Sequence, residues 1–137
     1  MHSEKCHHEL SSYVLRLALG GLLLIVGIGK FSGGVEAFVS GAAPMFDGTL
    51  IPMTLAKGFL TLVPLLEVVV GGLLLLGLFT SVAAWVGAFV FALFIVGLAT
   101  TGKPEMVNNF ILLFATVWLA KLPSGRISLD HLVGMGK

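Results

Sequence analysis

Charged residues are scarce in this sequence of 137 residues. They make up 11% of it, whereas an average soluble domain has about 25%. The single cysteine, Cys6, cannot form an intramolecular disulfide, so nothing in the sequence indicates an oxidising compartment. Eight Lys and Arg against seven Asp and Glu give a net charge of +1, and no basic tract is present. We therefore expect no nucleic-acid partner.

The motifs of common metal and cofactor sites are also missing. The sequence has no CxxC, CxxCH or HExxH, no nucleotide-binding glycine loop and no hydrolase elbow. Cys6, His7 and His8 are adjacent, and adjacent residues of a regular element do not readily chelate one ion. We expect no metal site, and we interpret the polar N-terminus as a disordered tail.

Apolar residues, by contrast, are abundant. They make up 57% of the sequence, and the mean hydropathy is +1.05. A soluble domain of this size has too high a surface-to-volume ratio to bury so much apolar surface, so its main solvent is expected to be lipid. The length suits one domain, residues 1–137. The first apolar run follows a polar dozen residues and precedes no A-x-A-like site, which favours a retained span over a cleaved signal.

Four apolar stretches are long enough to cross a bilayer as helices, which takes about 20 residues. There are too few segments for a closed barrel, and none shows the alternation that a barrel strand requires. The sequence therefore predicts an all-α fold, a transmembrane four-helix bundle. The predicted spans are residues 13–31, 59–79, 82–99 and 106–122.

The connection between the first two predicted spans, residues 32–58, is longer than most. Within it, Val35, Phe38 and Val39 follow the i, i+3, i+4 pattern of an amphipathic helix. A glycine and Pro44 end this pattern. We expect a short helix at the membrane interface, and its simplest role is to cap the bundle.

The second and third predicted spans are joined by little more than Thr80 and Ser81, which predicts a tight antiparallel hairpin. Four spans place both termini on one side of the membrane. The positive residues of that side are Lys5, Arg16, Lys121, Arg126 and Lys137, against Lys30, Lys57 and Lys103 on the other. This bias predicts cytoplasmic termini in a bacterial inner membrane.

Glu67 is the most informative residue, because it lies about eight residues, or roughly 12 Å, inside its predicted span. An intramembrane carboxylate is costly unless it is paired, protonated or facing water. Pro64, one turn earlier, is expected to kink the helix, and Gly71 and Gly72 to allow close approach of a helix or ligand. Six glycines inside the predicted spans are expected to allow close helix packing: Gly20, Gly27, Gly71, Gly77, Gly87 and Gly97.

Three residues are candidate partners of Glu67, with Lys30 and Asn109 preferred and Arg16 as the third. Lys30 and Asn109 are predicted at the same end of their spans, and Arg16 is nearer the opposite surface but long enough to extend inward. Two interpretations of Glu67 stay open. It either holds the helices together through such a pair, or it binds or protonates a ligand such as a quinone.

The chain resembles the DoxX family of small four-helix membrane proteins over residues 11–132 or so. The matching motifs are RLALGGLLLIVGIGKF from Arg16, PLLEVVVGGLLLLGLFT from Pro64, NFILLFA from Asn109 and GRISLD from Gly125. The family takes its name from a subunit of an archaeal thiosulfate:quinone oxidoreductase. The resemblance implies a quinone-linked or redox-complex role. It also implies an interior polar set formed by Arg16, Lys30, Glu67 and Asn109.

These observations favour a membrane subunit of a redox complex, with quinone as the candidate cofactor and Glu67 as the proton-exchanging group. The chain offers no ligand set for a redox centre of its own, so it is expected to be at most an accessory subunit of a quinone-linked oxidoreductase. The expected partners are the lipid bilayer and other membrane subunits or further copies of this chain. The alternatives are a purely structural subunit at the periphery of a larger complex and, less favoured, a small transporter.

Overall fold

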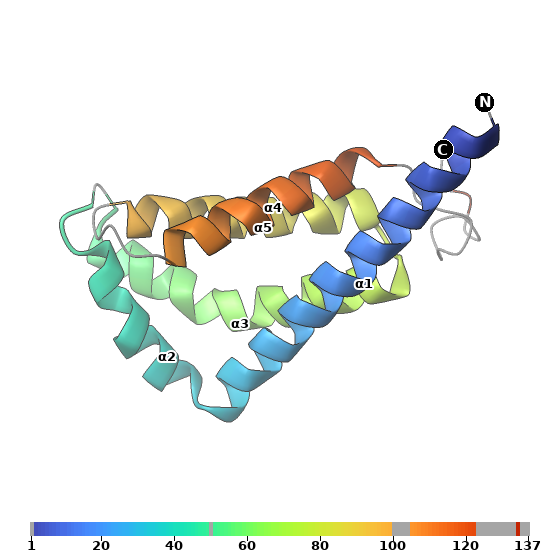
Figure 1. Cartoon of the computed structure of the whole chain (residues 1–137). Coiled ribbons are helices and arrows are strands. Elements are labelled where there is room, and N and C mark those ends of the chain that lie inside the picture. The colour runs from blue at the N-terminus through green and yellow to red at the C-terminus, as the bar shows by residue number, and fades with distance from the viewer. Residues whose placement is uncertain (1, 50, 100–104, 123–133, 135–137) are drawn as a thin grey trace.

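A computed structural model describes residues 2–49, 51–99, 105–122 and 134, with side chains from His8 onward except that of Glu105. These residues form α-helices, one short 3-10 helix and no strand, which confirms the predicted all-α class (Figure 1). In chain order the elements are α1 (His2–Ser32), α2 (Val35–Ala42), η1 (Ala43–Phe46), α3 (Met53–Leu76), α4 (Thr80–Leu98) and α5 (Glu105–Lys121).

Three of the described helices are long and apolar enough to cross a membrane. They are α3, α4 and the His8–Ser32 part of α1. The fourth predicted span corresponds to α5, which is apolar but has 17 residues, fewer than the roughly 20 that a perpendicular span takes. The described helices thus confirm three spans, and the four-helix transmembrane bundle stays a prediction.

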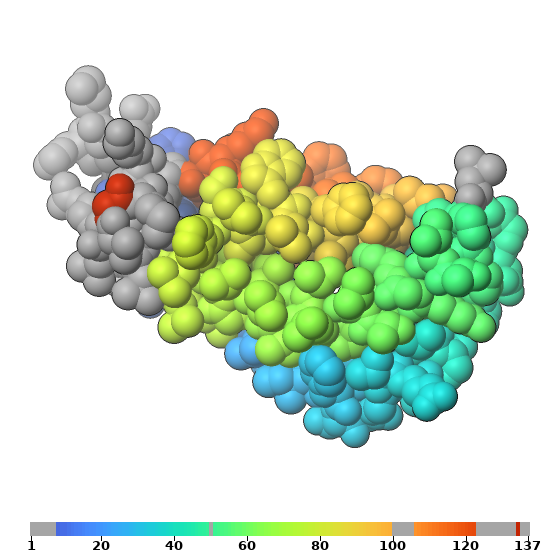
Figure 2. Space-filling view, turned by 180° about the vertical axis from the view of Figure 1, so that it is seen from behind, coloured from blue at the N-terminus to red at the C-terminus, as the bar shows by residue number. Residues whose placement is uncertain are grey.

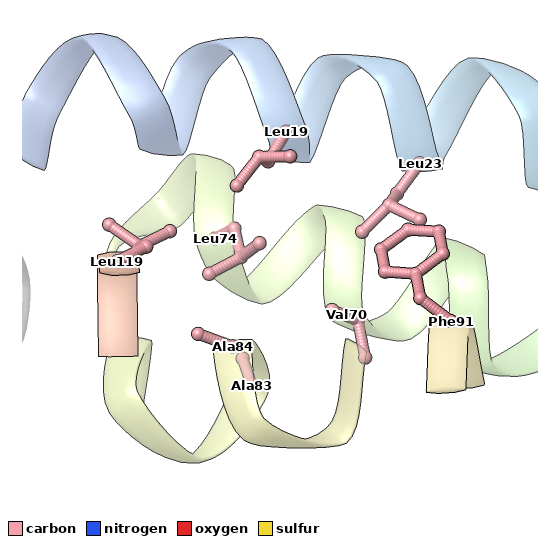
Figure 3. Close-up of a cluster of buried hydrophobic side chains, with 8 residues drawn as sticks. All are labelled: Leu19, Leu23, Val70, Leu74, Ala83, Ala84, Phe91 and Leu119. Carbon is pink, nitrogen blue, oxygen red and sulfur yellow. The ribbon is translucent and has the colours of Figure 1, made fainter. Parts of the chain in front are cut away.

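The long helices run antiparallel to their neighbours along the chain (Figure 1). Helix α1 packs mainly on α3, and α4 packs mainly on α5, while the α3–α4 hairpin joins the two pairs. As a result, α1 begins and α5 ends at the same end of the molecule. All four helices contribute to one buried cluster (Figure 3), formed by Leu19, Leu23, Val70, Leu74, Ala83, Ala84, Phe91 and Leu119.

Glycines bring α1 and α3 into backbone contact. A Cβ placed on Gly71 would lie 2.7 Å from the Leu24 backbone nitrogen and 2.8 Å from the Gly20 carbonyl oxygen. On Gly27, it would lie 2.8 Å from Val68 Cγ2. Membrane helices lack a hydrophobic drive to associate in lipid and rely on such close packing, so these glycines determine how closely the pair approaches.

The α3–α4 turn lies earlier than predicted. Helix α3 ends in a Schellman motif, in which the Leu78 N–H donates to the Leu73 carbonyl and Gly77 has φ 66°. Phe79 also has a positive φ, 48°. The predicted connection at Thr80 is therefore wrong, because that residue already begins α4, and Gly77 is a turn residue and not an interface glycine.

Two helix beginnings also differ from the prediction. Helix α1 begins at His2, so the predicted disordered N-terminal tail is wrong: its residues extend the backbone hydrogen-bond ladder of α1. Helix α3 begins at Met53, directly after Pro52, six residues before the predicted start. The first residues of α3 are too polar for a hydropathy criterion to include them in the span, but they adopt helical geometry. Glu67 consequently lies about 21 Å from the beginning of α3 and about 14 Å from its end.

The predicted short helix in the long connection is confirmed as α2, and η1 follows it with Pro44 in its first turn. The α2–η1 segment folds back on the first half of α3 (Figure 2). Phe46 is buried there, and a Cβ on Gly97 of α4 would lie 2.6 Å from its ring. Phe59 bridges Phe46 and Phe94, with ring centroids at 6.5 and 5.6 Å. This aromatic cluster closes the end of the molecule opposite to the beginning of α1.

We expect Gly71→Ala to destabilise the protein by about 1–3 kcal/mol, because the added methyl group meets backbone atoms that cannot move independently. Gly72→Ala is the matched control, since nothing lies within 4 Å of a Cβ at that position. Thermal unfolding in detergent, followed by circular dichroism, measures the difference. Equal melting temperatures for the two variants would show that the α1–α3 contact is not this close.

Candidate functional site

The clearest polar feature inside the protein is an ion pair between α1 and α3. Lys30 Nζ donates to Glu67 Oε1 at 2.5 Å, and the two side chains are 19% and 6% exposed. The predicted pairing of these residues is thereby confirmed. Because Glu67 lies far from both ends of α3, the pair neutralises a carboxylate that hydrocarbon would otherwise make very costly.

Local sequence explains how the two side chains meet. Gly27 lies one turn before Lys30, and a Cβ there would be only 3.0 Å from Glu67 Cβ and from the Pro64 carbonyl oxygen. The glycine therefore allows the two helices to approach within reach of a lysine. Pro64 is buried inside a continuous α3, and its ring leaves one backbone carbonyl of the preceding turn without its usual donor.

Two aromatic rings surround the Lys30 ammonium. Nζ lies 4.4 Å from the centroid of Phe38 on α2 and 5.8 Å from that of Phe94 on α4. A cation over aromatic faces gains about 0.5–2 kcal/mol, more where water is scarce. The α2 helix thus contributes more than a cap, because one of its residues holds the cation of the ion pair.

The ion pair forms part of the wall of a cavity of about 260 Å³. All five α-helices and η1 contribute to its wall, which is mainly apolar. The lining residues are Leu22, Leu23, Val26, Lys30, Phe38, Ala42, Met45, Glu67, Phe91, Phe94, Leu98, Asn109 and Leu112. An apolar cavity with a few convergent polar groups is the usual form of a small-molecule site.

The second carboxylate oxygen of Glu67 distinguishes this cavity from a plain packing gap. Oε2 is buried and has no hydrogen-bond partner in the described part of the chain. Leaving such an acceptor unsatisfied costs about 1–3 kcal/mol, more for a charged group. One oxygen of Glu67 therefore belongs to the helix pair, and the other is an unsatisfied acceptor on a residue that lines the cavity.

Only part of the predicted polar set lies at the cavity. It brings Lys30 and Asn109 to the cavity with Glu67, but Arg16 lies 14 residues before Lys30 along α1, or about 21 Å away. The Arg16 guanidinium is buried 5.8 Å from the Tyr13 ring, in the half of the molecule where the chain begins. It therefore does not belong to this site.

Sequence reasoning missed two contributors to the site. Phe38 was recognised only as part of an amphipathic pattern, and Phe94 lies in a stretch with no polar residue to single it out. Only the contact of their rings with Lys30 identifies them. Among the described residues, no three His, Cys, Asp or Glu side chains come together as a metal site. The side chains of Cys6 and His7 lie outside that description.

We expect Lys30→Met to destabilise the protein by about 3 kcal/mol, since it leaves the Glu67 charge buried without its counter-ion. Adding Glu67→Leu should restore most of the lost stability, because an apolar pair of similar volume often replaces a buried ion pair at little cost. Lys57→Met, which removes an exposed lysine of α3, is the control and should change stability by less than about 0.5 kcal/mol. Denaturant titration of the four proteins in micelles measures these values, and a Lys30→Met effect no larger than the control contradicts the argument.

Comparison with known proteins corrects the family expected from sequence. The model of the family described as "Methylamine utilisation protein MauE" matches residues 9–106, which include Lys30 and Glu67 but not Asn109. No curated protein and no solved structure matches the chain. The resemblance to DoxX is therefore wrong at the family level. Its motifs are runs of Gly and Leu with sparse polar residues, which different small membrane proteins share. With more than half of its length matched, the chain is an integral membrane protein that belongs to the MauE family.

Proposed function

We propose that this protein is an accessory membrane subunit of a methylamine utilisation system, that its cavity binds the headgroup of a quinone, and that Glu67 exchanges protons there. The observation that carries the proposal is the position of the Lys30–Glu67 pair in the wall of an apolar cavity, deep inside a membrane helix. The name of the family supports a role in a methylamine utilisation system, and the cavity supports the binding of a small ligand.

The proposed topology has four crossings. Helix α5 is about 26 Å long, so a small thinning of the bilayer allows it to span as the fourth helix. Trp85 and Trp118 are exposed near the end where α1 begins, as expected of aromatic anchors at an interface. The larger number of positive residues at that end favours its cytoplasmic location in a bacterial inner membrane. Among the positive residues counted for the two ends, Lys103, Arg126 and Lys137 lie outside the described residues.

The chemistry of the wall fits a quinone. Phe38 and Phe94 supply aromatic contact area in the cavity wall, and the Lys30 ammonium has N–H groups beyond the one donated to Glu67. The volume suits a ring and not its long tail. On α1, Leu22 and Val26 line the cavity but are also 43% and 37% exposed, so a tail would pass between α1 and α5 to the lipid.

Glu67 is the group in this cavity best suited to exchange protons with a bound quinone, because a carboxyl group both accepts and returns a proton. In this proposal the electrons come from a partner subunit that carries the redox centre. With proton exchange in this chain and electron transfer in a partner subunit, the chain has an accessory role within a larger assembly.

A purely structural role is the second candidate. The ion pair joins α1 and α3 directly, and the aromatic rings around Lys30 hold α2 and α4 to the same point. An interaction that connects four helices stabilises the fold whether or not a ligand binds.

Leu112→Trp tests ligand binding, because it places a large ring into the cavity from α5. Native mass spectrometry of the complex, extracted in mild detergent with its lipids and quinones retained, should find quinone on the wild type and little on this variant. Ile111→Trp is the matched control. Ile111 directly precedes Leu112 but is 61% exposed and does not line the cavity, so quinone should be retained. Absence of quinone from the wild type contradicts the proposed ligand.

Glu67→Gln tests the proton-exchanging role. The amide keeps the shape and can still hydrogen-bond Lys30, but it does not titrate, so quinone should remain bound while methylamine-dependent quinone reduction by native membranes falls about 100-fold. Glu36→Gln, an exposed acidic residue on α2, is the control. Unchanged quinone reduction in Glu67→Gln would leave only the structural role.

A further inference from the structure

We infer that the cavity binds the reduced form of its ligand, a hydroquinone with donating hydroxyl groups, in preference to the oxidised quinone. This inference rests on the proposed function and specifies the ligand form. It follows from the hydrogen-bonding groups in the cavity wall and not from its size, since the two forms differ little in volume.

The group that decides is Glu67 Oε2. Its side chain is 6% exposed, it belongs to the cavity wall, and Oε2 has no partner in the described part of the chain. As the partner of the Lys30 ammonium, the Glu67 carboxyl group acts as a hydrogen-bond acceptor. A ligand satisfies Oε2 only if it carries an O–H or N–H donor.

The two ligand forms differ in this respect. A quinone carbonyl only accepts, so it would place two acceptors against each other at Glu67. A hydroquinone hydroxyl donates to Oε2 and forms a short charge-assisted O–H···O⁻ hydrogen bond. Contact with the apolar wall, including Phe38 and Phe94, is similar for both forms, because each is a flat ring of nearly the same size. The preference therefore comes from Glu67.

The carboxylate can reach such a ligand without breaking the ion pair. The two oxygens of a carboxylate accept hydrogen bonds independently, so Oε2 can accept from a ligand while Oε1 accepts from the ammonium. Lys30 keeps further N–H groups for the ligand oxygen, which remains an acceptor after its hydroxyl has donated. One hydroxyl group thus satisfies both members of the pair.

The test compares a decyl-tailed benzoquinol with the corresponding benzoquinone, each titrated anaerobically into the full chain in lipid nanodiscs. Empty nanodiscs correct for the partitioning of each form into lipid. We expect the wild type to bind the quinol about tenfold more tightly. In Glu67→Gln the two affinities should become similar, because an amide both donates and accepts. Glu36→Gln should keep the wild-type preference.

Each outcome has a distinct meaning. Equal affinities for the two forms, or tighter binding of the quinone, overturn the inference and leave the proposed quinone site standing. Binding of neither form overturns the proposed function itself. The wild-type comparison decides the inference even if Glu67→Gln does not fold.

Discussion

The ion pair between Lys30 and Glu67 organises the molecule because hydrocarbon tolerates neither charge alone. A carboxylate in the second half of α3 has to meet a cation from a neighbouring helix, and the lysine near the end of α1 supplies it. The meeting is possible only where the two backbones come close, which Gly20, Gly27 and Gly71 allow. Electrostatics thus selects the partner, and small residues make the contact geometrically feasible.

The two ends of the protein are packed differently. In the middle of the bundle and towards the end where α1 begins, mainly aliphatic side chains from α1, α3, α4 and α5 fill the space between the helices (Figure 3). Towards the other end, α2 and η1 fold over the helices, and aromatic rings close the interior around the ammonium group. The cavity lies between the two clusters, since Leu23 and Phe91 of the first and Ala42 of the second line it.

Hydropathy and helix length sufficed to predict three of the spans, and the burial of Glu67 sufficed to predict a polar partner from three candidates, of which the structure shows Lys30. Element boundaries were less accessible. The turn at Gly77 depends on a left-handed backbone conformation, and polar residues continue α1 back to His2 although no apolar pattern marks them. Arg16 was misplaced because a sequence gives the reach of a side chain but not its direction. The family was misjudged because Gly- and Leu-rich motifs are not specific.

The structural and ligand-binding interpretations of Glu67 do not compete, because its two oxygens have different surroundings. Oε1 accepts from Lys30 and holds α1 to α3, so it accounts for a contribution to stability. Oε2 contributes nothing to that contact and is unsatisfied among the described residues. A group kept only for folding would gain from satisfying both oxygens within the bundle, as buried carboxylates usually do. The unsatisfied oxygen of a cavity-lining residue is therefore the feature that a structural role leaves unexplained and that the proposed hydrogen-bond-donating ligand would explain.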